Sequence, residues 1–121
     1  MLLNDRTLVL VAERFRVLSD PLRLRLLNAL SAGEKSVAEL VDATGASQAN
    51  VSKHLGVLAR AGLVSRRKAG LYVYYDCPDK SVFQVCDVVC GSLKSWLAAG
   101  LAQFDTGTAR SGVRGVRRRR A

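Results

Sequence analysis

The sequence predicts a mainly α-helical domain with one small β-hairpin, an α+β fold class. Apolar residues recur at helical spacing through about residue 62, and again from about residue 80 to residue 103. Between these stretches lies a short segment rich in β-branched and aromatic residues, which is typical of strands. The chain has 121 residues, 49% of them hydrophobic, so it is long enough and apolar enough to fold around one core.

The first two predicted helices are bounded by residues that favour helix ends. Apolar spacing predicts a first helix over roughly residues 5 to 18. Asp20 is expected to cap a second helix, because an aspartate can accept hydrogen bonds from the free N–H groups of a first turn. Pro21 suits the first position of that helix, and Gly33 indicates where the helix has ended.

Two short helices are then predicted back to back. Ser36 and Glu39 have the spacing of a capping box, and Gly45 suits the end of the helix that they begin. Ser47 caps the next helix, which ends at Gly62. The linker "TGAS" is too short for the two helices to run antiparallel, so the pattern predicts a helix-turn-helix.

The segment "LVSRRKAGLYVYYDC" predicts the β-hairpin. Its strands are expected near residues 63–68 and 71–76, with a turn at Ala69-Gly70. Asp79 can cap the last helix. We expect one DNA-binding and dimerisation domain over residues 1–104. Residues 105–121 are rich in arginine and are expected to form a basic, disordered tail.

The charge pattern indicates an anionic partner. The net charge is +9, which favours nucleic acid over acidic lipid. No acidic residue occurs between Asp42 and Asp76. The basic residues in that interval are Lys53, Arg60, Arg66, Arg67 and Lys68. We therefore expect this part of the fold to face phosphates.

Other functional classes are disfavoured. Three cysteines are too few for a secreted disulfide framework, and charged residues interrupt every long apolar stretch, so we expect a cytoplasmic protein with no membrane segment. The only histidine is far from the cysteines in the predicted fold, and no phosphate-binding loop is present, so we do not expect an enzyme. A basic architectural protein that binds nucleic acid without sensing anything remains an alternative.

The stretches "LSDPLRLRLL", "SQANVSKHLGVLARAGLVSRRKAG" and "YVYY" carry a resemblance to a known family. With them, residues 8 to 100 resemble the winged helix-turn-helix repressors of the ArsR/SmtB family. The resemblance implies a homodimer, formed through its terminal helices, that represses a palindromic double-stranded DNA operator until an inducer binds. No cofactor is then required for DNA binding.

The recognition helix is expected to begin at Ser47 and to enter a major groove. Gln48 is the best candidate for reading a base, because an amide can form paired hydrogen bonds to adenine. Ser52 and Lys53 lie on neighbouring parts of the exposed surface. Asn50 either contacts a base or helps to cap the helix.

Two further contacts with DNA are expected. The resemblance places His54 on the DNA-facing surface, although a buried hydrogen-bonding role and metal ligation remain alternatives. Arg66, Arg67 and Lys68 lie at the tip of the hairpin, where they either remain solvated or contact the backbone or the minor groove. The absence of nearby acidic residues favours contact.

The last predicted helix is apolar around most of its circumference, so it needs more than its own domain to cover it. Self-association explains this composition, in agreement with the dimer that the resemblance implies. The residues expected at the dimer interface are Phe15, Val82, Val85, Val89, Leu93, Trp96 and Leu97.

The inducer sites known in the resembled family are not matched here. The positions of its thiolate pair fall on Ser36 and Ala38, and Asp79 is the only match to its zinc ligands on the last helix. The remaining soft ligands are Cys77, Cys86 and Cys90.

Cys86 and Cys90 are one helical turn apart, with β-carbons about 5–6 Å from each other. A disulfide prefers about 3.5–4.5 Å, so converging thiolates fit this spacing better, with Cys77 as a third ligand. We expect arsenite or antimonite, or a soft metal ion such as cadmium or lead, as the inducer. Thiol oxidation or reaction with polysulfide is the alternative, and simple packing of the cysteines is another.

Overall fold

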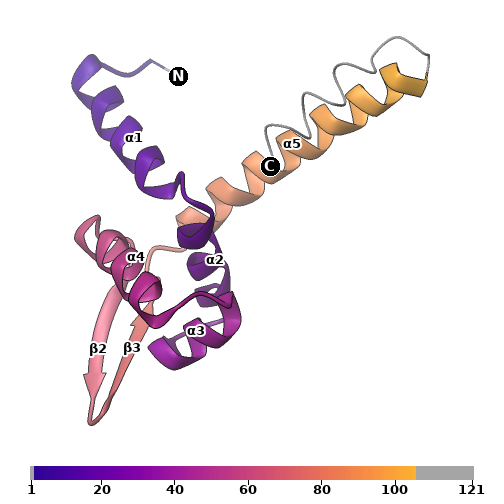
Figure 1. The fold of residues 1–121 in the computed structure, drawn as a ribbon. Helices are drawn as coiled ribbons and strands as arrows, with labels where there is room; N and C mark the ends of the chain where they lie inside the picture. The colour runs from indigo at the N-terminus through magenta and orange to yellow at the C-terminus, as the bar shows by residue number, and fades with distance from the viewer. Residues whose placement is uncertain (1, 106–121) are drawn as a thin grey trace. The chain divides into compact units, whose positions relative to one another are not determined.

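The computed structural model describes residues 2–105, which form five helices and three short strands (Figure 1). The helices are α1 (Asp5–Leu18), α2 (Pro21–Leu30), α3 (Val37–Thr44), α4 (Gln48–Arg60) and α5 (Ser81–Asp105). The strands are β1 (Lys35–Ser36), β2 (Ser65–Ala69) and β3 (Tyr72–Asp76). The chain divides after Phe83 into two units, and each is described by itself. Except for Asp105, the predicted tail lies outside the described residues.

The predicted N-caps of α2 and α3 are present. The Asp20 carboxylate accepts hydrogen bonds from the backbone N–H groups of Leu22 and Arg23, at 2.8 and 3.1 Å. The Ser36 hydroxyl and the Glu39 carboxylate each accept a hydrogen bond from the other residue's backbone N–H, which completes the predicted capping box. Gly45 ends α3 in the left-handed conformation, with φ of 71°.

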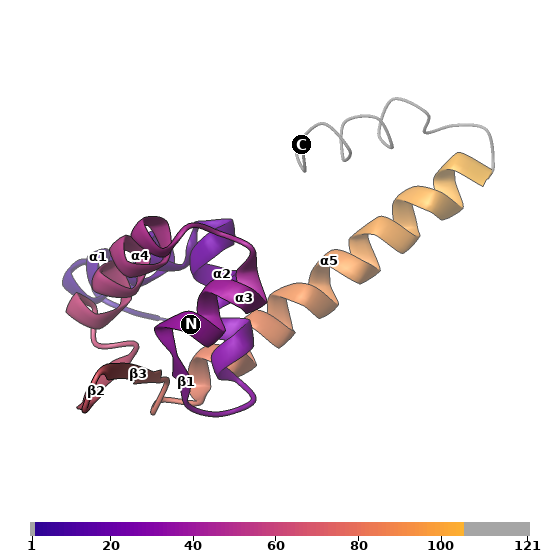
Figure 2. The same ribbon diagram turned by 60° about the horizontal axis from the view of Figure 1, so that its bottom comes forward.

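The strands form an antiparallel sheet in the order β1-β3-β2, which Figure 2 shows on one side of helices α1 to α4. The hairpin was predicted, but its turn lies one residue later than expected, at Gly70-Leu71, because Ala69 pairs with Tyr72. Gly70 has φ of 59°, as the first position of a type II′ turn requires. Strand β1 was not predicted.

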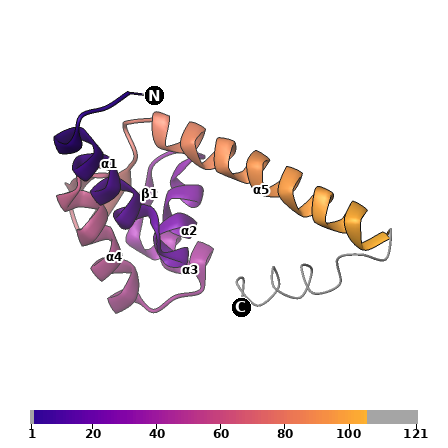
Figure 3. The same ribbon diagram turned by 90° about the horizontal axis from the view of Figure 1, so that it is seen from above.

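The core of the first unit lies where α2, α3 and α4 pack together, and Figure 3 shows these helices with α1 beside them. Its fully buried side chains are Leu26, Leu27, Leu30, Leu40, Val51, Leu55, Leu58, Leu63 and Cys77. Val82 also belongs to this core, with only 4% of its surface exposed. The expectation that Val82 lies in a dimer interface is therefore wrong, because its own domain already covers it.

Helix α5 is longer than the other helices that the structure describes, and most of its residues beyond Phe83 are exposed. Its segment Ser81–Ala102, 22 residues in all, is long and apolar enough to cross a membrane. The segment does contain two charged residues, Asp87 and Lys94, but they do not exclude a membrane span by length and composition, which corrects the expectation that no such segment exists. A helix that packs against another protein passes the same test of length and composition, so the finding does not assign α5 to a membrane.

Candidate nucleic-acid interface

The first turns of α4 present exposed polar side chains. Ser47 is the N-cap, and its hydroxyl accepts a hydrogen bond from the backbone N–H of Asn50 at 3.2 Å. The side chain of Asn50 takes no part in this cap and is exposed, as are Gln48, Ser52 and Lys53. The structure therefore brings four of the predicted DNA-contacting side chains onto the exposed surface of one helix.

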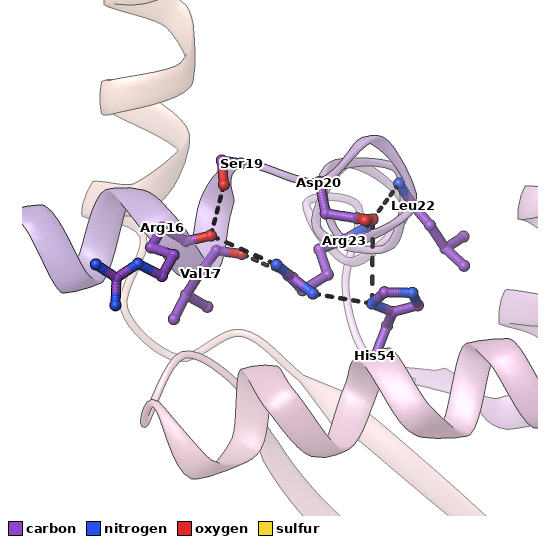
Figure 4. Close-up of polar contacts among 7 residues, drawn as sticks. All are labelled: Arg16, Val17, Ser19, Asp20, Leu22, Arg23 and His54. Carbon is purple, nitrogen blue, oxygen red and sulfur yellow. Dashed lines mark hydrogen bonds and ion pairs between the residues drawn. The ribbon is translucent and has the colours of Figure 1, made fainter.

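His54 points back into the first unit, as Figure 4 shows. Its side chain is only 15% exposed, and its Nδ1 lies 3.1 Å from Nη1 of Arg23 and 4.0 Å from Oδ1 of Asp20. A guanidinium can only donate, so Nδ1 accepts in this contact and the imidazole proton resides on Nε2. Of the three predicted roles for His54, the geometry favours the buried hydrogen-bonding one.

Arg23 joins three helices at this point (Figure 4). Its Nε donates to the carbonyl of Val17 at 2.5 Å, and its Nη2 donates to the carbonyl of Arg16 at 3.4 Å. These carbonyls belong to the last turn of α1, where carbonyls lack partners from a following turn of the helix. The Arg16 carbonyl also accepts from the backbone N–H and the hydroxyl of Ser19, the C-cap. One guanidinium thus links the end of α1 to the start of α2 and, through His54, to α4. No local sequence signal identified Arg23.

The hairpin presents its basic residues beside α4. Arg66, Arg67 and Lys68 are all exposed, but they lie along β2 and not at the tip of the hairpin as predicted, because each pairs with a residue of β3. Arg66 lines a hollow of about 580 Å³, together with Gln48 and Ser52 of α4 and residues of α3 and β3. Two of the predicted DNA-contacting residues of α4 thus share one concave surface with Arg66.

Arg67 is already paired within the domain. Its Nε and Nη2 donate to the two carboxylate oxygens of Glu34, at 3.1 and 2.8 Å. Its guanidinium also lies over the ring of Tyr74, 4.7 Å from the ring centre. The hydrogen bonds from Arg67 lower the pKa of Glu34 below its ordinary value, so this pair is ionised at neutral pH.

The three thiols differ in exposure. Cys77 is buried in the core of the first unit, whereas Cys86 is half-buried and Cys90 is exposed on α5. Burial raises the pKa of the Cys77 thiol, which keeps it protonated at neutral pH. Within residues 2–105, no three His, Cys, Asp or Glu side chains lie close enough together to hold a metal ion. Cys77 belongs to the first unit and Cys86 and Cys90 to the second, so the convergence of three thiolates stays a prediction.

The other residues expected at a dimer interface are available to a partner. Phe15 on α1 is 54% exposed. On α5, Val85, Val89, Leu93 and Trp96 are exposed, and Leu97 is half-buried. Phe15 and the exposed valine and leucine side chains of α5 thus keep much of their surface open to solvent within their own units.

Comparison with known proteins identifies the family. A family model described as bacterial regulatory protein, arsR family, matches residues 20–66, which run from the cap of α2 to the start of the hairpin. The crystal structure of Rv0081 from M. tuberculosis superposes with a TM-score of 0.70 and 33% sequence identity, covering 79% of this chain and 97% of that chain. The chain belongs to the ArsR family of bacterial regulatory proteins. Its ArsR fold is the winged helix-turn-helix that was predicted.

Two further ArsR comparisons bear on function. A probable mercury resistance operon repressor of Streptomyces lividans is 44% identical over 71 residues, which cover 59% of this chain and 57% of the relative. The solution structure of a homodimeric winged helix-turn-helix DNA-binding domain, Mb0332 of Mycobacterium bovis, has a TM-score of 0.67 and 30% identity, covering 78% of this chain and 91% of that chain. The chain spans 57% to 64% of the length of the first curated relatives that it matches.

Proposed function

We propose that this chain is a sequence-specific transcriptional repressor that binds a palindromic operator as a homodimer in the cytoplasm. The surface formed by α4 and the hairpin carries the proposal. Gln48, Ser52 and Lys53 are exposed beside the basic strand β2, and no carboxylate is present in the sequence between Asp42 and Asp76. An α-helix fits the major groove of B-DNA, where amide and hydroxyl groups can distinguish base pairs.

The comparisons support a repressor that acts as a dimer. The relative named for a mercury resistance operon is a repressor, and the Mb0332 structure is a homodimeric DNA-binding domain. A two-fold dimer places its recognition helices in successive major grooves, so its operator half-sites would be about one helical turn apart.

The test is selection of operator sequences from random DNA, followed by competition binding at physiological salt. A specific repressor should prefer one palindrome over competitor DNA by at least about 10³-fold. Gln48→Ala should relax the preference at one base position, because the amide that reads it is gone. Lys53→Ala is the matched control and should weaken binding equally for all sequences. Equal affinity of the wild type for all DNA would indicate the architectural alternative instead.

We further propose that a soft ion releases the repressor by binding at α5. Cys86 and Cys90 are one helical turn apart and are not fully buried, so two thiolates can face one ion. This chemistry favours four candidate inducers, which are arsenite, antimonite, cadmium and lead. The relative named for a mercury resistance operon adds mercury as a fifth. Cys77 is buried and has a raised pKa, which argues against a role as a third ligand in the folded domain.

Release from fluorescent operator DNA tests this second proposal. Each ion should lower the affinity of the wild type for DNA but not that of the Cys86→Ser/Cys90→Ser variant, whereas Cys77→Ser should respond like the wild type. Release by a polysulfide donor or oxidant, and not by ions, would favour the thiol redox alternative. A normal response by the double variant would show that these two thiols are not part of the sensing site.

A further inference from the structure

The two adjacent arginines of β2 lie on opposite faces of the hairpin, because side chains alternate along a strand. Arg66 pairs with Tyr75 across the sheet, and both residues line the hollow beside α4. Arg67 pairs with Tyr74 on the other face, and neither residue lines that hollow. The sequence "RRK" therefore presents two arginines with different surroundings.

Arg67 uses two of its N–H donors in hydrogen bonds within the domain, whereas Arg66 uses none in a hydrogen bond to another described residue. The two hydrogen bonds from Arg67 to Glu34 form a bidentate ion pair, which is the geometry that makes such pairs strong and specific. The ring of Tyr74 covers the same guanidinium. Arg66 is exposed and makes no ion pair with any other described residue, although Asp42 also lines the hollow.

The contacts of Arg67 span the sheet. Arg67 lies on β2 and Tyr74 lies on β3, while Glu34 directly precedes β1, so these three residues cross the order β2-β3-β1. We call them the wing clasp. Ser36, the last residue of β1, is also the N-cap of α3. The wing clasp therefore links β2 to Glu34, in the segment that leads through β1 into the helix-turn-helix.

We propose that Arg67 is a positioning residue, which fixes the hairpin relative to the helix-turn-helix through the wing clasp, and that Arg66 is the arginine of the hairpin that contacts DNA phosphate. This inference rests on the proposed DNA-binding function. It divides the two adjacent arginines of β2 into a structural one and a contacting one, which the sequence alone could not separate.

Removal of Glu34 distinguishes this arrangement from direct contact. If Arg67 bound phosphate, the Glu34 carboxylate would compete for it, and Glu34→Ala would strengthen DNA binding. If Arg67 positions the hairpin, Glu34→Ala should weaken operator binding, as Arg67→Ala should. For an exposed pair supported by an aromatic ring, we expect each change to lower the affinity by about two- to fivefold.

The salt dependence of operator binding gives the second readout. Each phosphate contact contributes about 0.9 to the slope of log affinity against log salt concentration. Arg66→Ala should therefore reduce the slope by about 0.9, while Arg67→Ala and Glu34→Ala should leave it unchanged. Glu13→Ala, at an exposed carboxylate of α1, controls for the general effect of removing a negative charge.

Charge exchange completes the test. The double variant Glu34→Arg/Arg67→Glu should bind more tightly than Arg67→Glu alone, because the pair is restored while position 67 can no longer attract phosphate. Failure of this rescue, tighter binding by Glu34→Ala, or a slope reduced by Arg67→Ala and not by Arg66→Ala would each overturn the inference.

A second measurement separates this inference from the proposed function. If the wild type has no specific operator, the repressor proposal fails, but the wing clasp can still be examined by hydrogen exchange. Arg67→Ala and Glu34→Ala should both speed exchange at the amides of β2 and β3, whereas Arg66→Ala should not. Equal exchange in all three variants would contradict the clasp itself.

Discussion

At the scale of single residues, Asp20 shows how one side chain serves two neighbours. Its carboxylate caps α2, and the backbone hydrogen bond from Arg23 is the main reason that its pKa lies below the ordinary value of 3.8. The backbone N–H of Leu22 donates to the same carboxylate and lowers the pKa of Asp20 further. The ionised form of Asp20 is therefore favoured in the folded state.

This pKa shift predicts a loss of stability in acid. Because the pKa of Asp20 is depressed by folding, its contribution is fully present above 3.8 and is lost as the pH falls through the folded value. Asp20→Ala should lower the free energy of unfolding by about 1 kcal/mol at neutral pH, the usual cost of losing an N-cap. The difference from the wild type should shrink below pH 3.8 in urea denaturation series. Asp20→Asn, which keeps an acceptor at the cap, should cost less; an equal loss would contradict the capping role.

At the scale of elements, the turn between α3 and α4 depends on Gly45. Its φ of 71° belongs to the left-handed region, and a β-carbon added there would meet no atom within 4 Å. The cost of a side chain at this position is therefore conformational and not steric crowding. The angle between the two helices of the helix-turn-helix depends on this one backbone conformation.

Two substitutions at Gly45 test this dependence. Gly45→Ala should lower the free energy of unfolding by about 1–2 kcal/mol, because alanine resists the left-handed conformation. Gly45→Asn should cost less, since asparagine tolerates it. The measurement is the urea midpoint at constant m-value. Equal midpoints for both variants and the wild type would mean that the turn does not require this conformation.

The predictable part of the fold is the part with local sequence signals. The caps at Asp20, Ser36 and Ser47 were predicted because a cap acts on residues two or three positions away. Strand β1 was missed because two residues cannot show a period. The pairing of Glu34 with Arg67 was missed because 33 positions separate them and only the folded sheet brings them together. The sequence could not decide whether His54 is buried for the same reason, since its partners Asp20 and Arg23 lie at the start of another helix.

At the scale of the whole molecule, the exposed apolar residues of α5 call for a partner. Leu93 is 51% exposed, and Val89 and Trp96 are exposed to a similar extent. A contiguous apolar surface of this kind marks an interaction site in a soluble protein. A second copy of the chain is the occupant that fits the homodimeric Mb0332 structure.

Leu93→Glu should therefore convert a dimer to a monomer in sedimentation equilibrium, because the dimer would bury an unpaired charge. Ser92→Glu introduces the same charge at the adjacent position of the helix and serves as the control, which should remain dimeric. A monomeric wild type, or equal dissociation of both variants, would contradict the predicted interface.

The burial of Cys77 has a consequence for the chemistry of the whole chain. A protonated thiol in a closed core does not react with alkylating reagents, because the thiolate is the nucleophile and access is blocked. Cys77 becomes reactive only in molecules whose core has opened, whereas Cys90 is open to solvent in the folded state. The rate at which Cys77 is alkylated therefore reports how often the core opens. The rate at Cys90, in the same chain, shows how fast the reagent modifies an exposed thiol.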